Sequence, residues 1–493
     1  MRMGSVVFTI WLAIVFDLFP GPVWAEVKAY GLSLLWSHDL GDVSFHVRGG
    51  HTPDTFLSFS NNGRFLALGT LEGDLLVFES RSGQVVLKRK IPEAMVKKLA
   101  FSPEDDVLYY GEQGPEGSVC ALSFPGGQEK WCFSTARDLG RGEPPPPGDL
   151  YAIYHQPGIY RLEVLKGGDL LVLANHSWYD SRRRIWRRLS RLYRLNPEGR
   201  LRWAYPRKGP APLTMIYADA DAAGKRIGVM ALLPSEDPED LRLFGPRPQS
   251  FLLLDGRDGS LLWQYSIEPL KPYFDRVSAW ESVSLSPEGR LAGVGTSDGR
   301  LFLFDLEEKK AKVLSLATPI LIGGFPVSAT LSFGLFGPDG RFYVITGEST
   351  LPFALPLLVD RPAGPHPAAR SLFAVEPEGT ISWRFHSPFR LQGLAVSRNG
   401  RVLAVGSAAF RKEGFRVKQF GVLVFRLWGE GGGLSRLLGY FPTAGICFFH
   451  LAVSPEGDLV AAVETPWRDE WGRIHGKYRL ILLKVMPVGE AEP

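Results

Sequence analysis

Cysteine is scarce in this sequence, with three residues among 493, and no two of them are neighbours. So few cysteines allow at most one disulfide bond and exclude a small scaffold that depends on several. A strong excess of charge is also lacking, because 56 lysines and arginines face 52 acidic residues. A formal charge of +4 on so long a chain provides no overall attraction for polyanions. Because the start of the chain also predicts export, we expect no nucleic-acid partner, despite a local basic cluster at 176–194.

Long apolar runs are missing beyond the first residues, so we expect no transmembrane segment in the mature chain. The beginning of the chain has the features of a secretory signal: Arg2, an apolar run at 5–16, and small residues at Val23 and Ala25. We expect cleavage of residues 1–25 and export to the periplasm or the extracellular space. An uncleaved membrane anchor is the alternative, although about a dozen apolar residues are short for crossing a bilayer. No cysteine follows the run, which argues against a lipid anchor.

Catalytic and metal-binding motifs are few. There is no phosphate loop or dinucleotide fingerprint, and the nine histidines show no spacing typical of metal ligands. Ser297 lies in a formal Gly-x-Ser-x-Gly match, but in a predicted hairpin rather than at a strand-to-helix elbow. The acidic runs at 219–224 and 255–260 lack the spacing and the distal glutamate of calcium loops, and Asp and Gly are what tight turns require. We therefore expect no catalytic activity, no cofactor and no metal.

What the sequence does contain is an internal repeat, which begins with a turn of five residues. In seven of the eight copies the fourth place is glycine, which adopts a positive φ without steric cost. In the second copy this place is taken by Asp105, a residue type that tolerates the left-handed region. The eight turns lie at 60–64, 102–106, 165–169, 221–225, 286–290, 337–341, 397–401 and 454–458.

Each turn opens a unit of strand-like runs, and the last turn of most units has a glycine four residues before a large apolar residue, as in Gly259 and Trp263. Eight four-stranded units predict an all-β, eight-bladed β-propeller that occupies residues 26–493 as one domain. A β-sandwich array or separate small domains would need linkers, and units resume on both sides of the one candidate, 140–150. The blades are expected to begin near 57, 99, 161, 215, 283, 331, 394 and 450.

One strand-like run, 33–39, precedes the first unit and has no partner nearby. It carries Trp36 in the pattern of a fourth strand. The eighth unit has only three strands and ends at 478–485. We therefore predict that 33–39 pairs with 478–485, completes the last blade and closes the ring, so that no incomplete edge remains.

The repeats resemble those of two known families. The glycine–tryptophan turn of "LLLDGRDGSLLWQYS" (252–266) resembles the repeat of quinoprotein-type, PQQ-binding propellers, and "VSLSPEGRLAGVGTSDGRLFLFD" (283–305) is similar to WD40-type repeats. The resemblance covers nearly all of 33–490 and implies the fold. Quinoprotein dehydrogenases hold their cofactor against adjacent, disulfide-bonded cysteines and a calcium ion, and this chain has neither the cysteine pair nor an assignable calcium cluster. The chain also resembles BamB-type envelope propellers, which bind polypeptides, but it lacks their lipid-attachment cysteine.

Cys120 and Cys132 flank a turn in "VCALSFPGGQEKWCF". If the turn centres on Gly126 and Gly127, the two cysteines fall opposite each other on paired strands, where Cβ atoms are about 4.5–5.5 Å apart. We expect a disulfide bond between them, with two buried thiols as the alternative. Cys447 is left over and is expected to be buried.

Enlarged loops are expected on one face of the propeller. The turns between first and second and between third and fourth strands are short, whereas the loops on the other face are repeatedly long. Insertions that gather on one face of a repeat protein often mark its binding face. The insertions lie at 136–160, 175–190, 231–249, 347–370, 407–419 and 464–477.

Two insertions combine aromatic residues with arginines, which are enriched in recognition surfaces. The candidate residues are Trp178, Tyr179, Arg182, Arg183, Arg184, Trp186, Arg187 and Arg188 in the first, and Trp467 and Trp471 in the second. We expect a protein partner there, with an anionic glycan or lipid headgroups as alternatives. The simpler interpretations are arginines that pair with acidic neighbours and tryptophans that pack on the rim.

The sequence thus predicts an exported, monomeric, non-catalytic propeller that binds or scaffolds proteins in the cell envelope or outside it. Two alternatives remain open. One is an enzyme sited in the central channel, such as a divergent PQQ-dependent dehydrogenase. The other is a propeller that binds glycans or anions.

Overall fold

The computed structural model describes residues 31–41, 55–143, 150–210, 214–232, 249–279, 282–351, 364–408, 420–427, 436–447, 451–468 and 471–486. The predicted signal segment 1–25 lies outside these residues. The expected all-β class is confirmed, because the described helices are the short α2 (Ala136–Leu139) and the 3-10 helix η3 (Leu150–His155). No helix in this part of the chain is long and apolar enough to cross a membrane.

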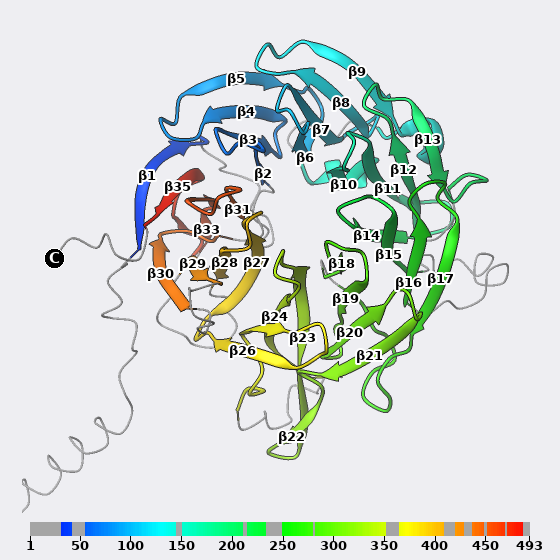
Figure 1. Cartoon of the computed structure of the whole chain (residues 1–493), viewed down its shortest axis with the longest axis vertical. Helices are drawn as coiled ribbons and strands as arrows, with labels where there is room; N and C mark the ends of the chain where they lie inside the picture. Colours follow the sequence, from blue (N-terminus) through cyan, green and yellow to red (C-terminus); the bar gives the residue numbers. More distant parts are fainter. Residues whose placement is uncertain are drawn as a thin grey trace, which may run out of the picture.

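The strands form sheets that follow one another around a central axis (Figure 1). The first sheet contains β2 (Thr55–Phe59), β3 (Phe65–Thr70), β4 (Asp74–Glu79) and β5 (Val85–Lys90). The next sheet has eight strands: β6 (Met95–Phe101), β7 (Val107–Gln113), β8 (Ser118–Ser123), β9 (Glu129–Ser134), β10 (Gly158–Val164), β11 (Leu170–Asp180), β12 (Ile185–Leu195) and β13 (Leu201–Tyr205). The third contains β14 (Thr214–Ala220), β15 (Arg226–Leu232), β16 (Gln249–Asp255) and β17 (Leu261–Ile267).

The second half of the ring continues in the same way. The fourth sheet contains β18 (Ser284–Leu285), β19 (Leu291–Gly295), β20 (Arg300–Asp305) and β21 (Lys310–Ser315). A five-stranded sheet follows, with β22 (Ile320–Ile322), β23 (Phe325–Phe336), β24 (Phe342–Thr350), β25 (Ser371–Val375) and β26 (Ile381–His386). The next contains β27 (Arg390–Val396), β28 (Val402–Ala408), β29 (Phe420–Arg426) and β30 (Arg436–Thr443).

The last four-stranded sheet combines strands from both parts of the chain, in the order β1-β35-β32-β31. Its strands are β1 (Leu32–Asp39), β31 (Leu451–Val453), β32 (Leu459–Glu464) and β35 (Arg479–Val485). A separate two-stranded hairpin, β33 (Trp467–Arg468) and β34 (Ile474–His475), lies between β32 and β35 in sequence.

The hydrophobic core lies between neighbouring sheets. Leu75 of β4 and Leu108 of β7 are both fully buried in one cluster that joins the first two sheets. Leu68 of β3 and Leu482 of β35 are buried in another cluster, which joins the first sheet to the last. Each sheet is therefore held by burial of both of its faces, which is the packing that stabilises a radial repeat.

The repeated turns adopt the backbone that the sequence predicts. The glycine in the fourth place has a positive φ throughout, for example 69° at Gly63 and 76° at Gly457, and Asp105 has a φ of 59°. The serine that opens several of these turns also has a role. The hydroxyl of Ser60 accepts a hydrogen bond from the backbone N–H of Phe65 at 2.9 Å, and that of Ser454 accepts one from Leu459 at 2.9 Å. The turn is thereby tied to the strand that follows it.

Tryptophans of the outermost strands bind the neighbouring sheet. Trp131 in β9 donates its indole N–H to the carbonyl of Pro197 at 2.9 Å, and Trp203 in β13 donates to Gly256 at 2.9 Å. A Cβ atom at Gly199 would lie 2.5 Å from Trp131. Gly199 and Gly259 thus leave room for the tryptophan of the preceding sheet, in addition to adopting a positive φ, whereas Gly127 faces Leu87 in the same way.

The N-terminal strand makes the same kind of contact with the first sheet. β1 pairs antiparallel with β35 along residues 32–39 and 479–485, with one register shift before Trp36. The indole N–H of Trp36 donates to the carbonyl of Ser80 at 2.8 Å, and a Cβ atom at Gly83 would lie 2.9 Å from the ring. β1 therefore lies beside the first sheet as β9 and β13 lie beside the sheets that follow them.

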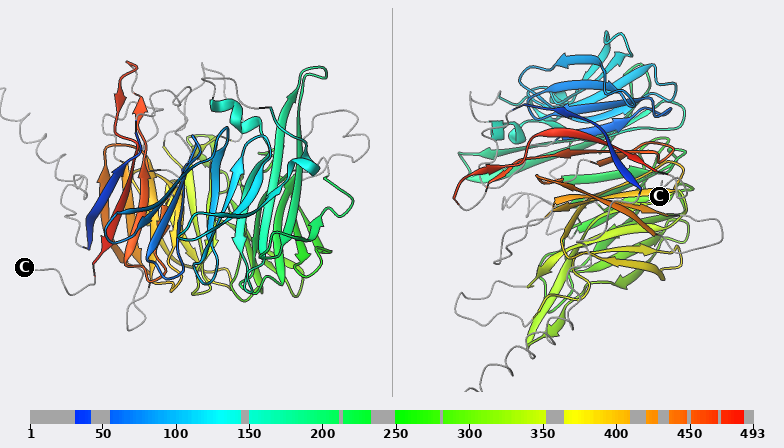
Figure 2. Two further views of the ribbon diagram at one scale, coloured as in Figure 1. Left: turned by 90° about the horizontal axis from the view of Figure 1, so that it is seen from above. Right: turned by 90° about the vertical axis from the view of Figure 1, so that its left-hand side faces the viewer.

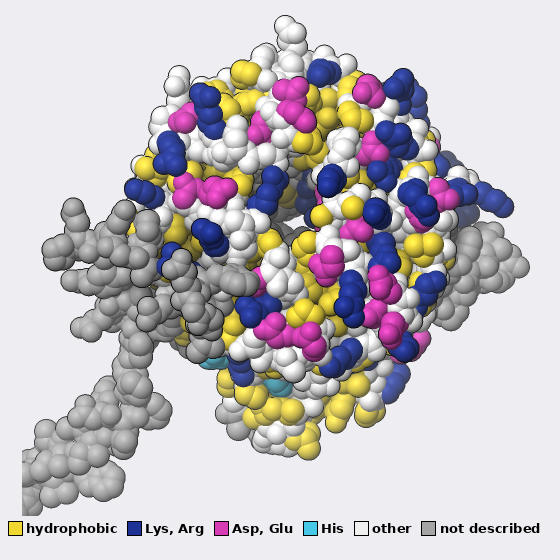
Figure 3. All heavy atoms as spheres, viewed as in Figure 1, with side chains coloured by type: hydrophobic (Ala, Val, Ile, Leu, Met, Phe, Trp, Pro, Cys, Tyr) yellow, Lys and Arg dark blue, Asp and Glu magenta, His cyan; other side chains and the backbone are white. Residues whose placement is uncertain are grey.

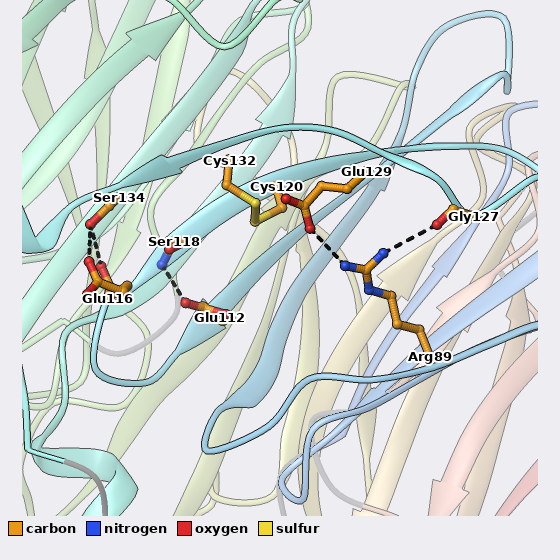
Figure 4. The surroundings of a disulfide bond; sticks show 9 residues. All are labelled: Arg89, Glu112, Glu116, Ser118, Cys120, Gly127, Glu129, Cys132 and Ser134. Atoms are coloured by element: carbon orange, nitrogen blue, oxygen red, sulfur yellow. Dashed lines mark hydrogen bonds and ion pairs between the residues drawn. A yellow bond between two sulfur atoms is a disulfide. The ribbon is translucent and has the colours of Figure 1, made fainter.

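A disulfide bond joins the two outer strands β8 and β9. Cys120 and Cys132 are direct partners in the register of these strands, and their sulfur atoms are bonded (Figure 4). Beside them Arg89 of β5 forms an ion pair with Glu129 at 2.7 Å and links the first sheet to β9. Cys447 is a buried free thiol, and burial raises its pKa to about 12.

Candidate functional site

The long hairpin of β11 and β12 contains the arginine-rich segment. The two strands pair along eleven positions, from Leu170↔Leu195 to Asp180↔Ile185. Figure 2 shows that the hairpin rises above the surrounding strands on one face of the ring, the same face that carries α2, η3 and the β33–β34 hairpin. The structure thus brings the first group of candidate residues together on one projecting ribbon.

The turn at the tip is formed by local hydrogen bonds. The carboxylate of Asp180 accepts hydrogen bonds from the backbone N–H groups of Arg182 at 3.1 Å and Arg183 at 3.2 Å. Arg184 completes the reversal with a φ of 57°. Aspartate favours such turns because its side chain bonds the backbone two or three residues on. The turn leaves the side chains of all three arginines exposed.

The base of the hairpin is anchored to α2. The Nδ1 atom of His176 lies 2.8 Å from the carbonyl of Leu139, and Arg191 forms an ion pair with Asp138 at 2.7 Å. The hydroxyl of Tyr193 donates to the same carboxylate at 3.0 Å. Burial lowers the pKa of His176, so the imidazole is held in its neutral form at neutral pH, and burial with Asp138 nearby raises the pKa of Tyr193.

The candidate side chains are divided between the two faces of the ribbon. Side chains at paired positions share a face, so Trp178 lies on the face of Arg187, and Tyr179 lies on the other face. Trp178 is partly buried and packs against His176 with the two rings tilted and their centroids 4.8 Å apart, whereas Tyr179 is 50% exposed. The side chain of Trp186 lies outside the described part of the structure.

Three of the arginines have no carboxylate partner among the residues that the structure describes. The side chains of Arg182, Arg184 and Arg188 are exposed and form no ion pair within the described residues. Arg187 lies 3.9 Å from Asp180. The interpretation that the loop arginines pair with acidic neighbours therefore holds weakly for Arg187 and fails for these three.

The second candidate group lies elsewhere. Trp467 is partly packed on the rim, because its ring stacks on His475 at 4.5 Å and its N–H donates to the carbonyl of Ala444 at 3.1 Å. Trp471 is 70% exposed, with the guanidinium of Arg473 at 4.7 Å from its ring. Figures 1 and 2 show β33 and the β11–β12 hairpin on opposite sides of the ring, so the two groups do not form one surface.

An open groove of about 420 Å³ lies at the foot of the hairpin. It is lined by Arg191, Leu201, Arg202, Trp203, Ala204, Arg207, Arg257 and Asp258. Its arginines are paired: Arg202 with Asp169 at 2.8 Å, and Arg207 with Asp258 at 2.9 Å. The groove cannot be recognised in the sequence, since it forms only where β13 meets the β16–β17 turn.

The opposite face of the ring has a different charge pattern. Figure 3 shows Lys and Arg side chains intermixed with Asp and Glu side chains around a hollow centre. Within the described residues, no group of three or more His, Cys, Asp or Glu side chains could hold a metal ion.

Ser297 lies in the turn between β19 and β20, as predicted, beside the buried Asp298 that forms an ion pair with Arg300.

Comparisons with known proteins identify the fold. No protein-family model matches the sequence, and no curated protein matches it. The C-terminal WD40 domain of Sif2 aligns with a TM-score of 0.55 at 10% identity, over 93% of this chain and 99% of that chain. The Dos1 propeller aligns with a TM-score of 0.50 at 10% identity, over 93% and 95%. At such low identity the likeness shows the fold alone: the chain is a β-propeller similar to WD40 propellers.

Proposed function

We propose that this chain is an exported, non-catalytic propeller that binds a partner protein through the β11–β12 hairpin. One observation carries the proposal: Arg182, Arg184 and Arg188 project into solvent on a ribbon that is anchored at its base, and none has a described carboxylate partner. The backbone that carries these arginines is already ordered, so binding does not have to order it, and each guanidinium can form forked hydrogen bonds with a carboxylate. Propellers generally present such surfaces to other proteins, which agrees with this assignment.

We further propose that the ring has eight blades and is closed by β1. The eight-stranded sheet is joined at its middle by one residue pair, Gly158↔Gln113, so it counts as two four-stranded blades. The order β1-β35-β32-β31 supports closure, because it gives the last blade its fourth strand. The contact of Trp36 with Ser80 supports it as well.

Export to the envelope is the part of the proposal that rests on the sequence. The apolar run at 5–16 and the small residues before Glu26 support a cleaved signal. The tryptophan–glycine contacts between sheets support the resemblance to quinoprotein-type and BamB-type repeats. Mass spectrometry of the protein from an envelope fraction tests export: a mature chain that begins at Glu26 is expected, and an intact Met1 in the cytoplasm would contradict it.

Capture of partners tests the binding site. In the hairpin variant, five arginines are changed to Ser: Arg182, Arg183, Arg184, Arg187 and Arg188. This variant should no longer capture proteins that the unchanged chain retains from envelope extract. A matched control removes five exposed positive charges in or beside the tight turns of the other face: Arg64, Lys166, Lys225, Arg290 and Lys310. Both variants should melt like the unchanged protein, because exposed substitutions cost little stability.

The captured protein is then purified and titrated against the three chains by calorimetry. We expect the hairpin variant to bind at least about tenfold more weakly, and the control variant to bind as the unchanged chain does. Equal binding by all three chains would remove the hairpin from consideration.

A further inference from the structure

The upper part of β12 is an open sheet edge. β12 pairs with β11 along its whole length, but β13 covers it only from Leu192 to Leu195, where Leu192 pairs with Tyr205. The chain leaves this edge at Pro206, and no described strand pairs with Ile185–Arg191 on the side away from β11. At the lower end of this stretch β14 packs against the ribbon, where the backbone N–H of Met215 donates to the hydroxyl of the buried Ser190 at 3.0 Å, so the edge is open above Ser190. The position directly above β13 is therefore unoccupied among the described strands, and an added strand there would continue the line of β13.

The charge of this part of the chain indicates what would bind at the edge. Residues 176–210 contain eleven lysines and arginines against two acidic residues, although the whole chain has a charge of only +4. Arg188 lies at the open edge with its side chain exposed, and Arg182 and Arg184 extend the positive charge around the tip. Below the open stretch, the groove beside β13 adds the side chains of Arg191 and Arg207.

Charged residues on an edge also protect a protein from aggregation, so that simpler role has to be weighed. A short exposed strand edge protects best against aggregation. The edge of β12 is not short, because it continues beyond β13 from Leu192 up to the tip at Ile185. A two-stranded ribbon is marginally stable alone, and here it is anchored through His176 and Arg191 to α2. A long, anchored, positively charged edge suits recognition better than protection.

We infer that the partner contributes an extended acidic segment that adds as a strand to the edge of β12 at Ile185–Arg191. This inference rests on the proposed function and names the partner's chemistry. Backbone hydrogen bonds of such an added strand provide affinity, and alternate side chains provide specificity. Carboxylates at alternate positions of the segment would meet either Arg187 and Arg191 on one face of the ribbon or Arg188 on the other.

Synthetic peptides test the inference with the full-length mature protein. The probe is a fluorescein-labelled nonapeptide of alternating Glu and Val, measured by anisotropy. Two further peptides carry backbone N-methyl groups at all odd or at all even positions. Because only every second residue of an added strand bonds the edge, one methylated peptide should bind about tenfold more weakly and the other within about twofold of the parent.

A second readout places the peptide on the hairpin. We expect it to slow amide exchange within Ile185–Arg191 and to leave the β33–β34 hairpin unchanged. Arg188→Glu should weaken the parent peptide about tenfold, and the peptide of alternating Lys and Val should then bind that variant better than the unchanged chain. The control variant of the other face should bind the parent peptide normally.

Several results would overturn the inference. Equal binding of both methylated peptides would mean attraction by charge alone, and absence of peptide binding would remove the segment altogether. Binding of phosphatidylglycerol vesicles or dextran sulfate, with no peptide binding, would favour a lipid or glycan partner instead. If the hairpin variant loses its protein partner while the methylated peptides bind alike, the proposed function stands and only the strand addition fails. If capture does not depend on the hairpin, the proposed function fails first.

Discussion

The indole of Trp36 lies against Gly83 of the first sheet and donates its N–H to the carbonyl of Ser80 at 2.8 Å. Through this contact the N-terminal strand, paired with β35 in the last sheet, also binds the first sheet. We expect Trp36→Ala to lower the free energy of unfolding by about 2 to 4 kcal/mol, because a partly buried ring and a hydrogen bond are lost. Trp471→Ala removes an exposed ring and should change it by less than about 0.5 kcal/mol. Urea unfolding followed by circular dichroism measures both, and equal effects would contradict the role of Trp36.

The glycine side of the same contact gives a separate prediction. Gly83→Ala places a Cβ atom 2.9 Å from the Trp36 ring at a residue with a φ of 73°. Gly472 has a similar φ of 81° with open space around it, so Gly472→Ala measures the cost of the backbone alone, about 1 kcal/mol. We expect Gly83→Ala to destabilise by at least about 1 kcal/mol more than Gly472→Ala in urea unfolding. Equal losses would show that Trp36 moves aside freely.

The disulfide bond predicts a dependence of stability on reductant. Replacing Cys120 and Cys132 by Ser should cost about 2 to 3 kcal/mol, since the bond restricts a short loop of the unfolded chain. Reductant should destabilise the unchanged protein by a similar amount and should leave the double variant unaffected. Alkylation after denaturation without reductant should label Cys447 alone, whereas three labelled thiols would contradict the bond.

His176 predicts a dependence on pH. Burial lowers its pKa in the folded protein below the ordinary value of about 6.5. Folding therefore favours the neutral ring, and this contribution is present above about pH 6.5 and is lost as the pH falls towards 5. Between pH 7.5 and pH 5 the unchanged protein should lose more stability than His176→Gln, which cannot titrate. NMR titration of the ring should give a midpoint below 6.5, and a midpoint above it would contradict the burial.

The sequence predicts the strands and turns well because both depend on local chemistry. Two kinds of local signal can be recognised in the sequence: short runs of β-forming residues, and glycines at positions that need a positive φ, such as Gly63 and Gly457. The signature is absent before β21, where Lys309 adopts a φ of 54° without being glycine. There the packed strands on either side determine the turn, and a local pattern cannot show that.

The candidate site could be predicted only in part. The arginines of 176–194 can be recognised in the sequence as a cluster. Whether each one forms an ion pair depends on carboxylates that belong to other segments of the chain. Asp138 reaches Arg191 from the connection before η3, and Asp258 reaches Arg207 from the next sheet. Tertiary packing determines which arginines remain exposed. The register between β12 and β13 determines that β13 ends opposite Leu192.

The sheet of β1, β35, β32 and β31 also has a consequence for biosynthesis. β1 is made first, but its partner β35 leaves the ribosome only near the end of translation. Until then β1 has no strand to join, and the sheet that contains both strands cannot form before the end of the chain has been made. A chain that stops before β35 would leave the edge of β32 open and β1 unpaired. Completion of this sheet therefore has to wait for the last strand, and we expect a chain that stops before β35 to be less stable than the full chain.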